Sequence, residues 1–251
     1  MLLVSPIGRP TWSPLPETEG ATSPFWAPDS QSIGFFDQQR RLKTVSVGGG
    51  SPRVIGETSA GLVPTGAWSE DGVILIGGAG AISRIAASGG VPVPVTTLGA
   101  RETGHRWASF LPDGVHFLFV AQSGLSNELR VGSLASTGTA SLGPVESHAR
   151  YANGHLVYVS GGHLVARRFD VKSRLFTGDP VVIAGEAAVV DPWARGQFSV
   201  SGTGMLAYSR TGRDLSQLTW RDRSGTPVGK AGEPGVYVNI NLSPDEQRIA
   251  A

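Results

Sequence analysis

A short motif returns along this chain at nearly constant spacing. It combines a large aromatic or apolar residue, a turn of the Pro-Asp-Gly type and an apolar segment. The strongest copies are Phe25-Trp26-Ala27-Pro28-Asp29, Trp68-Ser69-Glu70-Asp71-Gly72, Phe110-Leu111-Pro112-Asp113-Gly114 and Leu242-Ser243-Pro244-Asp245, and weaker ones begin near Tyr151 and Phe198. The motif heads stand at 26, 68, 110, 151, 198 and 242, at intervals of 42, 42, 41, 47 and 44 residues, which indicates a repeat architecture.

Each repeat predicts four short antiparallel strands. One apolar strand ends at the aromatic residue, the turn reverses the chain, and a second apolar strand follows. A third strand and a short outer strand come after Gly-rich turns. Since four strands in about 40 to 45 residues are typical of a propeller blade, we predict an all-β β-propeller of about six four-stranded antiparallel blades. The blades are expected near residues 22–55, 65–96, 106–142, 147–184, 197–230, and 236–251 together with 1–16.

The two ends of the chain are predicted to share the last blade. The chain begins with strand-like pieces at 2–5 and 11–16 and ends two strands into its last repeat. N-terminal strands that complete this blade would close the ring and leave no exposed sheet edge. Residues 1–251 then form a single propeller domain, and a fragment of a longer protein is the alternative that the sequence leaves open.

Composition excludes several classes of protein. Lys and Arg number 21 against 20 Asp and Glu, and no basic cluster is present, so nucleic acid is not an expected partner. The absence of cysteine rules out disulfides and thiolate chemistry. No apolar run approaches the roughly 20 residues of a membrane helix, and the N-terminus lacks the basic region of a signal peptide. No membrane insertion is expected for this chain.

The repeated turns resemble the Ser-Pro-Asp-Gly signature of TolB-like, WD-repeat-like propellers over nearly the whole chain. The run Thr103-Gly104-His105-Arg106-Trp107, and the run 19–26, are similar to the propeller that follows the kinase domain in bacterial, acidobacterial-type serine/threonine protein kinases. The resemblance implies a sensor or interaction region. The kinase motifs themselves are missing, so no kinase activity is implied. A TolB-like or receptor-kinase context would imply an extracytoplasmic location; otherwise the compartment stays open.

The recurring polar and aromatic residues are assigned structural roles. The aspartates Asp29, Asp71, Asp113 and Asp245 are expected to bind turn backbone, and the aromatic heads are expected to pack between blades. The histidines at 148, 155 and 163 have spacings of 7 and 8, with no nearby carboxylate pair, and predict no metal site. No Gly-x-Ser-x-Gly pentapeptide is present. No catalytic residue, cofactor or metal is therefore assigned.

Binding is expected at the loops of one propeller face, because a rigid ring holds variable loops in place. The candidate residues are Glu102, His105, Arg106, Trp193 and Arg195. Gly104-His105 also resembles the Gly-His dipeptide of WD repeats, where the imidazole braces a loop. The predicted function is a non-catalytic, monomeric scaffold that recognises a protein or small ligand. The alternatives are a propeller enzyme acting on polysaccharide, as a lyase or glycosidase, and a carbohydrate-binding propeller.

Overall fold

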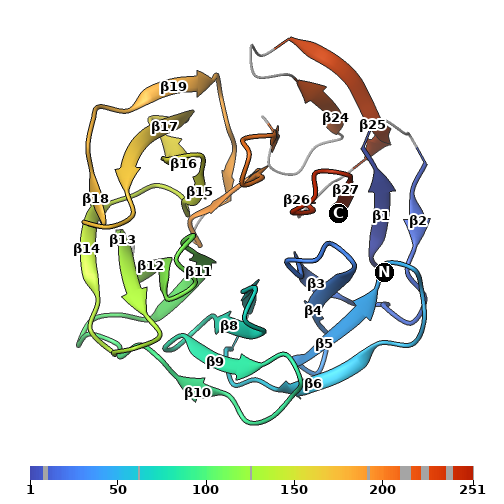
Figure 1. Cartoon of the computed structure of the whole chain (residues 1–251), viewed down its shortest axis with the longest axis horizontal. Helices are drawn as coiled ribbons and strands as arrows, with labels where there is room; N and C mark the ends of the chain where they lie inside the picture. Colours follow the sequence, from blue (N-terminus) through green and yellow to red (C-terminus); the bar gives the residue numbers. More distant parts are fainter. Residues whose placement is uncertain are drawn as a thin grey trace.

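A computed structural model of the chain describes residues 1–7, 11–61, 63–124, 126–190, 193–209, 216–221, 226–235 and 240–250. All regular structure in these ranges is β-strand. Within them no helix is long and apolar enough to cross a membrane. The sheets lie around a common centre, as a propeller requires (Figure 1).

Five sheets contain four or more antiparallel strands. The first holds β3 (Thr22–Trp26), β4 (Ser32–Phe36), β5 (Arg41–Ser46) and β6 (Arg53–Glu57). The second holds β7 (Thr65–Trp68), β8 (Val73–Gly77), β9 (Ser83–Ala86) and β10 (Val93–Pro94). The third holds β11 (Gly104–Phe110), β12 (His116–Ser123), β13 (Ser126–Ser133) and β14 (Ala140–Pro144). The fourth holds β15 (Arg150–Ala152), β16 (His155–Ser160), β17 (His163–Asp170), β18 (Leu175–Phe176) and β19 (Val181–Ala184).

The fifth sheet joins the two ends of the chain. Its order is β2-β1-β27-β26, built from β2 (Ser13–Pro14), β1 (Leu3–Pro6), β27 (Arg248–Ala250) and β26 (Asn241–Leu242). Val4 pairs with Ala250 and Ser5 with Ile249. The predicted completion of the last blade by N-terminal strands is therefore confirmed.

The predicted number of about six blades needs correction, because the residues that the structure describes form five. The fifth predicted repeat, 197–230, forms separate two-stranded sheets instead: β22 (Phe198–Val200) with β23 (Leu206–Tyr208), and β24 (Ser216–Arg221) with β25 (Pro227–Gly235). A further pair, β20 (Val189–Val190) and β21 (Arg195–Gly196), precedes them. This repeat lacks a Pro-Asp-Gly turn, and its first two strands have only three residues each. Parts of the intervals 197–230 and 236–251 lie outside the described residues.

Three of the four repeated aspartates, Asp29, Asp113 and Asp245, bind turn backbone as predicted. In the turn that contains Asp71, the hydroxyl of Ser69 accepts the N–H of Val73 instead. Oδ1 of Asp113 accepts the backbone N–H groups of Val115 and His116, at 3.1 and 2.9 Å. Asp29 and Asp245 each accept the N–H two residues further on. The residue after the aspartate has positive φ in all four turns, and glycine occupies this position in two of them. This is the left-handed conformation that such turns require.

Large side chains fill the space between neighbouring sheets. Phe25 and Phe36 of the first sheet pack with Ile74 and Ile76 of the second, and Phe117 and Phe119 of the third pack with residues of the second. The aromatic heads of the repeats are buried or partly buried in these clusters, at 26, 68, 110, 151 and 198. The expectation that they form core, and not an aromatic binding surface, is confirmed. The packed sheets hold the innermost strands at fixed positions around the centre.

Candidate functional site

A small polar cavity lies among the innermost strands. Its walls come from β11, β15, the segment 195–198 and β26, which follow one another around the ring. Its volume is about 40 Å³, which is room for one or two non-hydrogen atoms or a single water. It is lined by Trp107, His148, Arg150, Arg195, Gly196, Gln197, Phe198, Ile240 and Asn241. We call it the axial cavity.

Arg150 gives the axial cavity its charge. Burial lowers the pKa of its guanidinium to about 10, so the group stays protonated at neutral pH. Its Nη1 atom donates to the carbonyl of Ala108 at 3.4 Å, and within the described residues it forms no salt bridge. None of the described residues that line the cavity carries a carboxylate. A partly buried cation with no counterion among the described residues is unfavourable, and such a group can serve a bound anion or a developing negative charge.

His148 lies beside Arg150 as a neutral ring. Burial is the main cause that holds its pKa well below 6.5, and the nearby charges of Arg150 and Arg195 add to this. The ring stacks on Phe198, with centroids 4.7 Å apart and an interplanar angle of 3°. Its Nδ1 accepts the N–H of Gly196 at 3.2 Å, so the neutral tautomer carries its hydrogen on Nε2. His148 therefore anchors the neighbouring segment and offers a hydrogen-bond donor.

The segment 193–197 packs into the centre of the ring. Ala194 is fully buried, and its carbonyl accepts the N–H of His148 at 2.8 Å. The side chain of Gln197 is 2% exposed, and its Nε2 has no hydrogen-bond partner within the described residues. A buried donor without a partner lowers the stability of the folded state by about 1–3 kcal/mol. Gln197 thus adds a second donor for a ligand oxygen beside Arg150.

Trp107 has a strained backbone at this cavity. Its φ is 59°, which is rare for a bulky residue, and it lies at a register shift between β11 and β12. The strain is held by two bonds: its N–H reaches Oγ1 of Thr65 at 3.1 Å, and its indole Nε1 reaches the carbonyl of Trp193. Such outliers concentrate at functional sites, where the surrounding structure fixes them.

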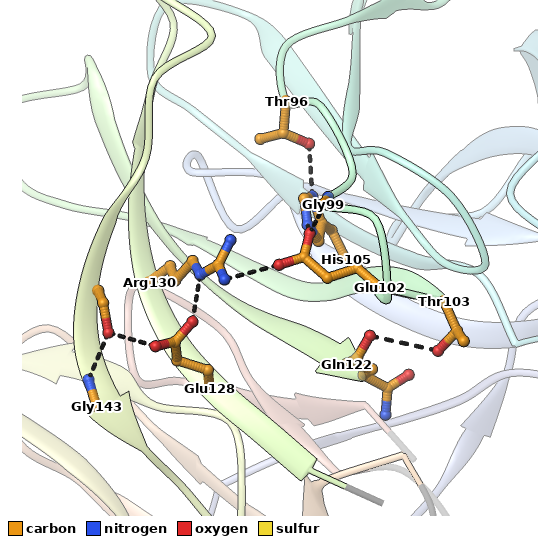
Figure 2. Close-up of polar contacts among 10 residues, drawn as sticks. Thr96, Gly99, Glu102, Thr103, His105, Gln122, Glu128, Arg130 and Gly143 are labelled. Carbon is orange, nitrogen blue, oxygen red and sulfur yellow. Dashed lines mark hydrogen bonds and ion pairs between the residues drawn. The ribbon is translucent and has the colours of Figure 1, made fainter. Parts of the chain in front are cut away.

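The structure separates the predicted site residues into two places. Trp193 and Arg195 belong to the segment at the axial cavity. Glu102 and His105 lie elsewhere, in a network between the second and third sheets (Figure 2). Arg106 is 5% exposed, and its Nε donates to Gln122 at 2.7 Å. His105, Arg106 and Arg195 lie on strands, whereas Glu102 and Trp193 lie shortly before strands. The role of all five residues in binding stays a prediction.

The Glu102–His105 network braces the fold. The His105 ring is fully buried, with Nδ1 2.8 Å from Oγ1 of Thr96 and Nε2 2.9 Å from Oε2 of Glu102 (Figure 2). The other carboxylate oxygen of Glu102 pairs with Arg130 at 2.7 Å. Hydroxyl, imidazole and carboxylate are thus in line, as in hydrolytic triads. However, the Thr96 hydroxyl also accepts the N–H of Ile82, and Thr96 is 3% exposed, so no substrate reaches it. The predicted bracing role of His105 agrees with this geometry.

Arg150, His148 and Gln197 are not among the site residues predicted from the sequence; His148 was considered there only as a metal ligand. A usable signal was present for Arg150, because it directly precedes the aromatic head of its repeat and therefore lies on an innermost strand. Gln197 precedes Phe198 in the same way. Polar residues at this position of successive repeats converge on the axis of a propeller.

The buried histidines predict acid-sensitive stability. Burial lowers the pKa of both His105 and His148 below 6.5, so the unfolded chain takes up protons first as the pH falls. Stability should therefore decrease below about pH 6.5, by about 1.4 kcal/mol per pH unit for each histidine. Urea unfolding between pH 7.5 and 5 measures this slope. His148→Phe should lower the slope by about 1.4 kcal/mol per pH unit, the contribution of one histidine. An equal slope in His148→Phe contradicts the assignment.

Metal binding does not fit the axial cavity. Calcium requires several oxygen ligands, usually including carboxylates. The lining residues that the structure describes include two arginines and no carboxylate. Among the described residues, no group of three or more His, Cys, Asp or Glu is arranged to hold a metal ion.

Comparison with known proteins places the chain among propellers. No family model matches the sequence, and no curated protein matches it significantly. Similar solved structures include the calcium-binding protein regucalcin from Agrobacterium tumefaciens (15% identity, TM-score 0.65, 90% of this chain and 79% of that one). A gluconolactonase from Xanthomonas campestris has 15% identity and a TM-score of 0.66, over 92% and 85% of the chains. TolB from Acinetobacter baumannii has 18% identity and a TM-score of 0.60, over 84% and 55%.

These comparisons correct the predicted function. The prediction of a non-catalytic scaffold, and with it the statement that the chain is no enzyme, is contradicted by structural neighbours that include a gluconolactonase. The predicted similarity to TolB-like propellers is confirmed at the level of the fold. The link to kinase-associated propellers stays a prediction.

Proposed function

We propose that this chain is an enzyme that hydrolyses a small lactone or another ester, and that the axial cavity holds the oxygen of the reacting carbonyl group. The observation that carries the proposal is Arg150, a partly buried guanidinium that has no carboxylate partner among the described residues. In the same cavity lining, Nε2 of Gln197 has no hydrogen-bond partner within that part of the chain. Ester hydrolysis develops negative charge on the carbonyl oxygen, and preorganised donors that await such charge are a major source of catalysis.

The chemistry follows from this placement. Water adds to the carbonyl carbon, and the carbonyl oxygen becomes an oxyanion that Arg150 and Gln197 stabilise. The bond from the carbonyl carbon to the alkoxy oxygen then breaks, and a proton from the attacking water ends on that oxygen. A lactone opens to a hydroxy acid, which loses its proton at neutral pH. A cavity of about 40 Å³ admits the carbonyl group, so the rest of the substrate lies outside it. No step is assigned to a metal, because the lining does not fit one.

The similarity to gluconolactonase supports a lactone as the substrate. A sugar lactone as substrate also agrees in part with the alternative predicted from the sequence, an enzyme that acts on polysaccharide. A glycosidase is less well supported, since most glycosidases use two carboxylates at about 5 to 9.5 Å across the scissile bond. The axial cavity has none in its described lining.

The proposal predicts loss of hydrolysis in Arg150→Met. We expect the wild-type chain to hydrolyse D-glucono-1,5-lactone or 4-nitrophenyl acetate above the uncatalysed rate, followed by proton release or by 4-nitrophenolate absorbance. Loss of one strong donor to the oxyanion should lower kcat/KM by about 100-fold. Arg150→Lys should retain part of the rate. Because the substitution to Met removes a partly buried charge with no counterion among the described residues, the thermal midpoint should not fall.

The exposed Arg84→Met is the matched control and should keep the full rate. Addition of EDTA should also leave the rate unchanged, which distinguishes this mechanism from a metal-dependent one. The proposal fails if the wild-type chain accelerates none of a panel of lactones and esters, or if Arg150→Met is as active as wild type.

A further inference from the structure

A second, larger cavity lies between the fourth sheet and the hairpin β22–β23. Its volume is about 640 Å³, within the range of about 300–1,000 Å³ that is typical of small-molecule sites. It shares no lining residue with the axial cavity. We call it the inter-blade cleft.

Both walls of the cleft are mainly apolar. The fourth sheet contributes Val157, Ala166 and Ala184, and the hairpin contributes Val200 and Leu206. Two of these positions are alanines that face the space with short side chains. The apolar surface continues along β19. Ile183, which is 43% exposed, lines the cleft, and the neighbouring Val181 and Val182 are 64% and 59% exposed. Contiguous exposed apolar surface beside a pocket marks a binding site more often than a free surface.

Among the described polar residues that line the cleft, Glu246 carries a negative formal charge. Asn153, His155, Thr203, Tyr208 and Glu246 line it, and no lysine or arginine does so among the described residues. Oε1 of Glu246 accepts the hydroxyl of Ser201, and Oε2 has no hydrogen bond within the part of the chain that the structure describes. The described lining of the cleft is therefore negatively charged, whereas that of the axial cavity is positively charged. An apolar ligand with a cationic or hydrogen-bond-donating end would complement the cleft.

We propose that the inter-blade cleft binds a small apolar molecule that carries an amine, with the apolar part between the two walls and the amine at Glu246. The carboxylate attracts an ammonium group and repels a carboxylate, whereas the walls remove the hydrocarbon from water. This site is separate from the proposed hydrolytic centre, so its ligand need not be a substrate.

The test uses the full chain and a neutral fluorescent amine, N-phenyl-1-naphthylamine. Its fluorescence should rise on binding, and octylamine should displace it at about tenfold lower concentration than octanoate. Ala184→Phe and Ala166→Phe each fill the cleft from a different strand, and each should weaken probe binding by about tenfold or more. Ala135→Phe, at an exposed position in the loop between β13 and β14, is the matched control and should bind as wild type.

Glu246→Gln separates charge from shape. This variant should bind the probe as wild type but should lose the preference for octylamine over octanoate. Circular dichroism and thermal midpoints establish that each variant is folded, and ester hydrolysis should persist in all of them. The proposal is overturned if the probe does not bind wild type, if both filled variants bind it unchanged while folded, or if octanoate competes as well as octylamine.

Discussion

Deletion of residues 1–16 is expected to abolish cooperative folding. The deleted segment contains β1 and β2, and β1 is hydrogen-bonded to β27 on its other side. Leu2, Val4 and Leu15 are 3%, 6% and 3% exposed, and they pack against Trp26 and Phe35 of the first sheet. Burial of each such side chain contributes about 1.5–3 kcal/mol, and a whole domain has only about 5–15 kcal/mol of net stability. The loss of these three buried side chains is therefore expected to remove most of the net stability of the domain.

Deletion also leaves β27 as an open edge, which favours association with other chains. Thermal unfolding followed by circular dichroism, together with size-exclusion chromatography, measures both effects. As a control, a synthetic peptide of residues 1–16 added to the shortened chain should restore part of the folded signal. A shortened chain that stays monomeric and melts cooperatively within a few degrees of the full-length midpoint would show that closure contributes little.

The repeat was predictable because each copy contains the residues that stabilise one local turn. An Asp followed by a residue with positive φ stabilises the same turn in each copy, so Asp29, Asp113 and Asp245 could be recognised without any knowledge of the ring. The number of blades was not predictable from the spacing alone. The interval that follows Tyr151 contains an additional strand, β19, and leads into three-residue strands, which a motif count cannot register.

The axial cavity could not be predicted from local sequence, because its position depends on the three-dimensional arrangement of the strands. Arg150, Gln197 and Asn241 are far apart in the sequence, and the curvature of the ring brings them together. Glu102 and His105 drew attention because they are polar and close to a motif, but their burial shows that they satisfy each other. Residues that are close in the sequence thus led to a network that stabilises the fold. The candidate site is instead formed by residues that are far apart in the sequence and meet when the ring closes.

Gly66→Val is expected to be the most damaging single substitution at a sheet interface. Gly66 lies on β7, opposite the ring of Phe25, and a Cβ atom at this position would be 2.0 Å from Cε1 of that ring. Gly34 limits the same ring from the other side, where a Cβ atom would be 2.3 Å from Cζ. Phe25 therefore cannot move away from a new side chain. Overpacking of this kind costs about 1–3 kcal/mol, and the two extra methyl groups of valine place the expected loss at about 3 kcal/mol or more.

Urea unfolding of Gly66→Val measures this loss, and Gly185→Ala is the control, because a Cβ atom at that exposed position meets no other atom within 4 Å. The control should stay within about 0.5 kcal/mol of wild type. If steric conflict with Phe25 is the cause, Phe25→Leu should destabilise the wild-type chain but partly rescue Gly66→Val, with a coupling of at least about 1 kcal/mol in the double-mutant cycle. Additive effects of the two substitutions would instead place the cost in the backbone of β7.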